Sequence, residues 1–183
     1  MPLIRFNPEV ARVALQNGAL GIGEDHGEPE ARQLALELIN MGVVRHFFTE
    51  LYEEHGNVEK LATARIAAAS GDSLRVVESL CPSGFSLGNS ITQGRVIARA
   101  LQRGATVHLA DTPHMHMGAS RHAQRHQNIL AKYRRATNQP GPAPARADVA
   151  AGRGCLLLWG GAHFEGANAL ENFIIGLPFM MHP

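Results

Sequence analysis

Two short turns in this sequence place a histidine three residues after a glycine, each at the end of an apolar run. One turn runs from Gly23 to His26 and the other from Gly160 to His163. Histidine is the side chain that both ligates metals and moves protons near neutral pH. Glycine permits a tight turn, so the imidazole can point into a crevice instead of back into a sheet. The two turns are therefore the first candidates for a site that does chemistry.

Carboxylates accompany these histidines at three predicted strand ends. Glu24 lies inside the first turn, Glu50 ends an aromatic and β-branched run, and Asp111 follows a third apolar run. A carboxylate can orient a histidine that acts as a general base, or it can join histidines in binding a divalent ion. Solvated carboxylates at strand ends would give the same pattern, so each group also has a purely structural interpretation.

Histidine is also unusually frequent, with ten in 183 residues. Five of them form a cluster along the chain beside Asp111, namely His108, His114, His116, His122 and His126. A metal site and an exposed polar loop followed by a solvated helix both fit this cluster, and the residues alone do not separate them.

Strands that alternate with helices must position these groups. Apolar runs predict strands at residues 19–23, 43–51, 105–110 and 155–159, and helical spacing predicts helices at 28–40, 57–70, 72–80, 89–103, 120–136 and 167–175. This order predicts an α/β fold with a mostly parallel or mixed central sheet flanked by helices. Ligands bind at the carboxyl ends of parallel strands, where Glu24 and His26, Glu50, Asp111, and His163 with Glu165 would meet.

Length and composition limit the class of protein. The chain has the length of a single α/β domain, residues 1–183, and its Pro- and Gly-rich segment 138–154 predicts a flexible loop within that domain. A net charge of +1 without charge blocks argues against nucleic acid or an anionic membrane as the main partner. Two cysteines without C-x-x-C spacing indicate neither a disulfide framework nor a thiolate zinc site.

The first residues and the apolar runs indicate where the protein acts. The start lacks a basic segment followed by an apolar stretch, and no run approaches the ~18 apolar residues that a membrane span needs. We therefore expect a cytoplasmic protein, or one exported by a route that leaves no such signal.

At these motifs the chain resembles the superfamily of TraB and Tiki proteins, erythromycin esterases and ChaN-like haem-binding proteins. The segment Leu20 to His26, LGIGEDH, is similar to that superfamily's first Gly-Glu-x-His turn, and Leu156 to Gly166, LLLWGGAHFEG, is similar to its closing Gly-x-x-His. Between them, Phe47 to Glu50 and Val107 to Asp111 resemble its acidic strand ends. Arg121 stands where the family commonly has an arginine that begins a helix.

The resemblance implies an erythromycin-esterase- or ChaN-like fold and a hydrolase that activates a water molecule. In a metal-free form, Glu24 would orient His26 or His163 as the base, while Arg45 or Arg121 stabilises the oxyanion. In a metal form, His26, His163 and Glu50, with Asp111 as a further candidate, would hold a divalent ion. The cofactor is therefore open between a divalent metal and none.

The substrate and the partners follow from the same resemblance. The substrate would be a small molecule or peptide with an ester, peptide or phosphodiester bond. A compact member without a targeting sequence resembles effector proteins that bacteria deliver into host cells, so a host protein is an expected target. The alternative class is a binding module, in which the same histidines hold haem, a metal or a host protein without turnover.

Overall fold

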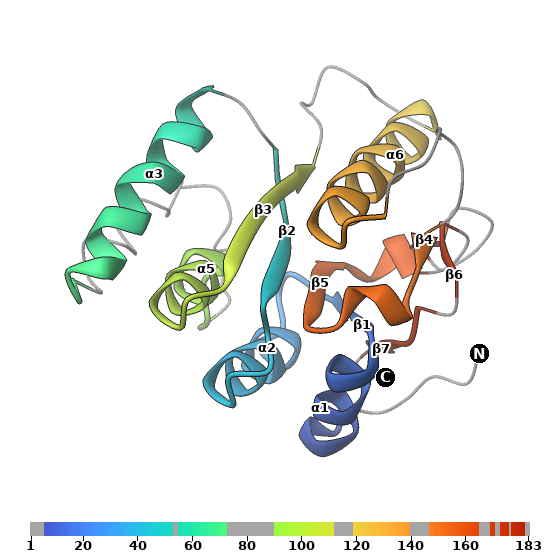
Figure 1. Cartoon of the computed structure of the whole chain (residues 1–183), viewed down its shortest axis with the longest axis horizontal. Helices are drawn as coiled ribbons and strands as arrows, with labels where there is room; N and C mark the ends of the chain where they lie inside the picture. Colours follow the sequence, from blue (N-terminus) through green and yellow to red (C-terminus); the bar gives the residue numbers. More distant parts are fainter. Residues whose placement is uncertain are drawn as a thin grey trace.

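Five parallel strands form the central sheet of this protein (Figure 1). The computed structural model describes residues 6–52, 55–72, 90–111, 119–139, 147–164, 169–170, 173–175 and 177–181. The strands are β1 (Ala19–Glu24), β2 (His46–Tyr52), β3 (Thr106–Asp111), β5 (Cys155–Gly160) and β7 (Phe179–Met181), in the spatial order β3-β2-β5-β1-β7. Each neighbouring pair is parallel, which confirms the predicted α/β class.

Helices cover both faces of the sheet. One face packs against α1 (Pro8–Asn17), α2 (Glu30–Asn40), α3 (His55–Ala69) and α5 (Gln93–Gln102). The other packs against α6 (Ala119–Ala136), which lies across the sheet from α2 and α5 in Figure 1. A second small sheet, of β4 (Ala147–Asp148) and β6 (Ile174–Ile175), lies on the α6 side together with the 3-10 turns η1 (Ala150–Gly152) and η2 (Gly161–Phe164).

The strands carry apolar side chains on both faces of the sheet. Because successive side chains of a strand point to opposite faces, they form two separate core clusters. In β5, Leu156 and Leu158 join the cluster under α2 and α5, whereas Leu157 and Trp159 join the cluster under α6. A strand in the middle of a parallel sheet has no solvated face, so it reads as a continuous apolar run. This is why residues 155–159 are recognisable as a strand from sequence.

Capping residues fix where two of the helices begin. The Asn7 side chain accepts hydrogen bonds from the backbone N–H groups of Glu9 and Val10, at 3.0 and 3.1 Å, and starts α1. The Thr92 hydroxyl accepts from the N–H of Arg95 at 3.2 Å and starts α5. Such caps satisfy backbone donors that have no partner within the helix.

The chain differs from the sequence prediction in its last third. Residues 167–175 were predicted as a helix, but Ile174 and Ile175 form β6, which pairs with β4. An apolar run of this length fits a helix or a strand, and the pairing with β4 decides between them. In the predicted loop 138–154, the described part contains β4 and η1. The predicted helix at 72–80 lies outside the described residues, apart from Asp72.

Two elements have no counterpart in the prediction. Helix α1 precedes the first predicted strand, and β7 adds to the free side of β1. Strand β7 is only three residues long, which leaves little periodicity to recognise in a sequence.

The parallel order brings the ends of β1, β2, β3 and β5 to one edge of the sheet. Glu24 aligns with Gly160, and Tyr52 aligns with Asp111. The register of β2 shifts between Thr49 and Tyr52, in the segment that contains Glu50. Such irregularities re-aim side chains and occur near functional sites.

Candidate functional site

The first Gly-x-x-His turn forms a carboxylate–histidine pair. Glu24 ends β1, and its Oε1 accepts a hydrogen bond of 2.6 Å from Nδ1 of His26. The Glu24 side chain is 1% exposed and that of His26 is 34% exposed. The pair therefore has a buried carboxylate that fixes an imidazole within reach of solvent.

A buried arginine holds this carboxylate in place. Arg32, in α2, donates from Nε and Nη2 to the two oxygens of Glu24, at 2.8 and 3.1 Å. Its Nη1 donates to the backbone carbonyl of Ile91 at 2.8 Å, so the guanidinium joins α2, β1 and the segment before α5. Bidentate pairing of this kind fixes orientation as well as charge.

Glu50 lies between the two histidine turns. Its Oε2 is 3.8 Å from Nε2 of His26 and accepts a hydrogen bond of 3.0 Å from the backbone N–H of Gly160. Its Oε1 is 3.6 Å from Nε2 of His163. A Cβ atom added at Gly160 would lie 3.5 Å from both Glu50 and His26, which shows how closely these groups surround the glycine.

The second turn places His163 in a buried chain of imidazoles. Nη1 of Arg125 lies 3.2 Å from Nε2 of His163, and Nδ1 of His163 lies 3.1 Å from Nε2 of His126. His163 therefore bridges Arg125 and His126 through its two ring nitrogens. Trp159 packs edge-on against the His163 ring at a centroid distance of 5.2 Å. His163 is thus held in one orientation by Arg125, His126 and Trp159.

Arg125 of α6 joins Asp111, Glu50 and His163, and so connects the groups around both turns into one network. Its Nε lies 2.5 Å from Oδ1 of Asp111, its Nη2 donates to Oδ2 at 2.8 Å, and its Nη1 reaches Oε1 of Glu50 at 3.3 Å. One guanidinium therefore links the carboxyl ends of β2 and β3 to the turn after β5. The network contains two arginines, three carboxylates and three histidines, and most of it is buried.

The charges in this network shift its pKa values in opposite directions. The hydrogen bond to Glu24 raises the pKa of His26 above its ordinary 6.5, against the effect of burial, and the charges of Glu24 and Glu50 raise it further. Burial alone would raise the pKa of Glu24, but hydrogen bonds from His26 and Arg32 lower it overall. For Glu50, burial acts in the same upward direction, yet His163, the Gly160 N–H and the charge of His26 lower its pKa to about 2. Both carboxylates are therefore ionised at neutral pH.

The donor set does not fit the metal form of the predicted site. Among the described residues, no three His, Cys, Asp or Glu side chains are grouped so that they could hold a metal ion. The guanidinium of Arg125 lies among Glu50, Asp111 and His163, where it supplies the positive charge to these predicted ligands. The arrangement instead suits proton transfer by an oriented, partly exposed imidazole.

The structure brings together six of the residues that the sequence singled out: Glu24, His26, Glu50, Asp111, His126 and His163. It does not bring Arg45 to them, because Arg45 precedes β2 at the opposite edge of the sheet, where its N–H bonds to the Gly154 carbonyl. Arg121 belongs to α6, but its side chain lies outside the described residues, as do His114, His116 and His122. His108 lies apart from the site, beside His46.

Two members of the network, Arg32 and Arg125, were missed as site residues, and His126 was named only as part of the histidine cluster beside Asp111. Each belongs to a helix, in which a charged or polar residue is normally assigned to the solvated face. A signal was present, since Arg32 shares a helical stripe with the buried Ala35, Leu36 and Ile39. A charged residue in an apolar stripe is a candidate partner for a buried charge of opposite sign.

Comparisons with known proteins support the fold but not a family. No protein-family model matches the sequence, and a search of curated proteins found no match. The structure is similar to that of the type III effector HopBA1, with a TM-score of 0.50, 16% sequence identity, and coverage of 97% of this chain and 82% of that chain. At this identity the likeness is one of fold alone, so the resemblance to the TraB, erythromycin esterase and ChaN superfamily stays a prediction. The described helices include none long and apolar enough to cross a bilayer. By the structural comparison, the protein shares its α/β fold with an effector of the type III class.

Proposed function

We propose that this protein is a hydrolase in which His26 acts as the general base toward a water molecule. The observation that carries the proposal is the Arg32–Glu24–His26 chain, because it ends in an oriented, partly exposed imidazole. Nδ1 of His26 is bound to Glu24, so Nε2, which lies 3.8 Å from Oε2 of Glu50, is the nitrogen that would receive a proton. A positioned base of this kind contributes roughly 10²–10⁴-fold to a rate.

The surrounding charges suit the proton transfer. When His26 takes a proton, the resulting imidazolium lies between the carboxylates of Glu24 and Glu50. Arg125, on the far side of Glu50, is the positive group nearest to the second turn and would stabilise negative charge that develops on the substrate. His163, fixed by Arg125 and His126, would position the substrate or the leaving group.

Water is the nucleophile that this geometry favours. The hydrogen bonds of His26 and His163 that the structure describes join them to carboxylate, guanidinium and imidazole groups. Cys155 begins β5, at the opposite end from the site, and burial raises the pKa of its thiol to about 12. The substrate class remains an ester, peptide or phosphodiester, in a small molecule or a peptide.

The cellular location in which the protein acts is a further part of this proposal. HopBA1 is described as a type III effector, and the shared fold supports, without establishing, delivery into a host cell. In that case the substrate or the target would be a host molecule.

Replacement of His26 by alanine is expected to lower hydrolysis by 10²–10⁴-fold. The measurement is kcat/KM on an activated ester, an activated phosphodiester and a fluorogenic peptide. Asp25→Ala is the matched control, because Asp25 lies in the same turn, is exposed, and its carboxylate accepts a hydrogen bond from the N–H of Gly27. Circular dichroism should show that both variants keep the fold of the parent. If none of the three substrate classes is hydrolysed, or if His26→Ala keeps full activity, the proposal is wrong.

The rate should rise with pH through a pKa above 6.5. Only neutral His26 can take a proton, and Glu24 keeps the imidazole protonated to higher pH than usual. Glu24→Gln removes that charge and should move the inflection of kcat/KM to lower pH, as well as lowering its plateau. A profile that is flat between pH 5 and 9 would contradict the assignment of His26, and an unmoved inflection in Glu24→Gln would contradict the role of Glu24.

A further inference from the structure

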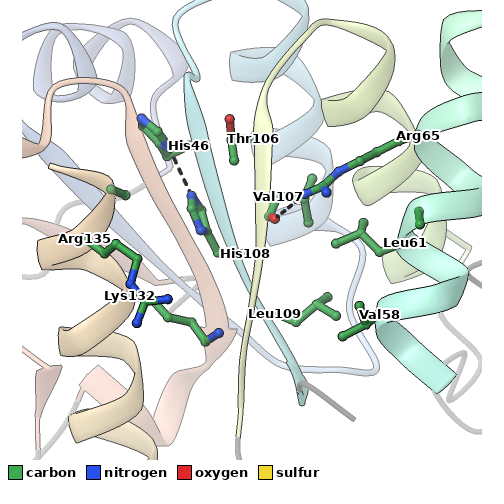
Figure 2. A pocket seen from close by; sticks show the side chains of 12 residues that line it. His46, Val58, Leu61, Arg65, Thr106, Val107, His108, Leu109, Lys132 and Arg135 are labelled. Atoms are coloured by element: carbon green, nitrogen blue, oxygen red, sulfur yellow. Dashed lines mark hydrogen bonds between the residues drawn. The ribbon is translucent and has the colours of Figure 1, made fainter. Parts of the chain in front are cut away.

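In a site that works through His26, the reacting water molecule must lie within hydrogen-bond reach of that imidazole. The cavity of about 530 Å³ beside β3 does not meet this condition (Figure 2). It lies between α3 and α6, its imidazoles are those of His46 and His108, and neither His26 nor Glu50 lines it. A space that does adjoin the His26 imidazole lies beside Gly160, the last residue of β5.

The backbone of Gly160 does not require a glycine. Among the described glycines, those with a left-handed backbone are Gly42, Gly71, Gly104 and Gly154. The φ angle of Gly160 lies outside that region, so other residues can adopt its conformation. The tight turn that the sequence suggests therefore does not explain why the chain has no side chain at this position.

Close packing explains the glycine of the first turn but not that of the second. A Cβ atom at Gly23 would lie 2.7 Å from Cγ of Met181 and 3.2 Å from Cα of Gly161, which is closer than carbon atoms normally pack. A Cβ atom at Gly160 would approach its nearest neighbours only to 3.5 Å, which is an ordinary contact distance. A methyl group would therefore fit at Gly160.

The atoms around this space belong to the candidate site. The nearest neighbours of a Cβ atom at Gly160 would be Oε2 of Glu50 and Nε2 of His26, both at 3.5 Å, and Cδ2 of His163 at 3.9 Å. Oε2 and Nε2 are 3.8 Å apart, and a water molecule with hydrogen bonds of about 2.8 Å to each can bridge that distance. The Gly160 N–H donates to the same Oε2 at 3.0 Å, which fixes the carboxylate beside the space.

We propose that Gly160 is a positioning residue, whose missing side chain leaves room for the reacting water molecule between His26 and Glu50. This inference rests on the proposed function and adds the place of the nucleophile. Nε2 of His26 takes one proton of the water, and Oε2 of Glu50 accepts a hydrogen bond from the other. The water oxygen bonds to the carbonyl carbon or phosphorus of the substrate. The bond to the leaving group breaks, and the proton held by His26 passes to that group.

Gly160→Ala tests the proposal, because the added methyl group would take the place of the water. We expect kcat to fall about 10²-fold while KM changes less than about threefold, since the rest of the substrate still binds. Gly27→Ala is the matched control: it adds the same methyl group to the first turn, 3.6 Å from the Asp25 carboxylate, and should keep the kcat of the parent. Thermal unfolding should be the same for the parent and both variants.

Crystal structures of the parent and of Gly160→Ala give a second test, which needs no substrate. The parent should contain an ordered water molecule within about 3.2 Å of both Nε2 of His26 and Oε2 of Glu50, and Gly160→Ala should lack it. Because the parent alone can show that the water is absent, this test holds even if the variant does not fold.

The outcomes separate this inference from the proposed function. If Gly160→Ala keeps the kcat of the parent, or if the parent crystal has no water shared by the two atoms, Gly160 does not position the nucleophile, although His26 can still be the base. A rise in KM at unchanged kcat would also overturn the inference, because the space would then hold part of the substrate. If the parent hydrolyses none of the three substrate classes, the proposed function is wrong, and a water seen in the crystal is not a nucleophile.

Discussion

Arg32→Met should lower the free energy of unfolding by about 3–5 kcal/mol. Arg32 is fully buried, and methionine of similar length leaves the carboxylate of Glu24 in the core without its bidentate partner. Removing one member of a buried pair is costly because the remaining charge has lost both water and its partner. Urea unfolding followed by circular dichroism gives the value directly.

Two further variants test whether the loss of stability comes from the buried pair of Arg32 and Glu24. Arg12→Met is the matched control, because Arg12 pairs with Glu9 on the exposed surface of α1 and should matter little. The double variant Arg32→Met, Glu24→Leu removes both buried charges and should recover a large part of the lost stability. A loss below about 1 kcal/mol in Arg32→Met would show that Glu24 is solvated or neutral, contrary to its burial in the structure.

The second large effect concerns Glu50 and acid. The pKa of Glu50 is lowered from 4.5 to about 2 in the folded protein. A carboxylate with a lowered folded-state pKa contributes stability above its unfolded pKa, and this contribution is lost as pH falls toward the folded-state value. The contribution is about 3 kcal/mol, and it should disappear between pH 5 and pH 2.

Glu50→Gln tests this assignment. The variant should be less stable than the parent at pH 7, and the difference should shrink steadily as the pH is lowered toward 2. Glu9→Gln replaces an exposed carboxylate and serves as the control, with little change at either pH. If the parent and Glu50→Gln differ equally at pH 7 and pH 3, the ionised form of Glu50 is not what stabilises the fold.

The positions of the central strands could be predicted from the sequence for a physical reason. Strands buried on both faces must be apolar throughout, and the residue that follows such a run lies at the edge where parallel strands end. The positions of Glu24, Glu50, Asp111 and His163 could therefore be inferred one by one. Their meeting at one edge followed from the parallel order of the strands, which the alternation with helices predicts.

The parts of the site that the sequence did not predict depend on tertiary contacts. Arg32 and Arg125 are buried because carboxylates on distant strands neutralise them, and no local pattern encodes that pairing. Arg125 reaches the site because its turn of α6 lies against Asp111 at the end of β3. The assignment of Ile174 and Ile175 to a helix was wrong for the same reason, since they form a strand through their pairing with Ala147 and Asp148.

The position of β5 in the sheet has a consequence for how the chain folds. β5 lies between β1 and β2, so residue 19 pairs with residue 155 and residue 46 pairs with the same residue from the other side. Until β5 is present, β1 and β2 have no shared hydrogen bonds, and the carboxylates of Glu24 and Glu50 have nothing to hold them near one another. Pairings between residues so distant along the chain form slowly. Insertion of β5 therefore joins the β2–β3 pair to β1 and assembles the candidate active site in the same late step.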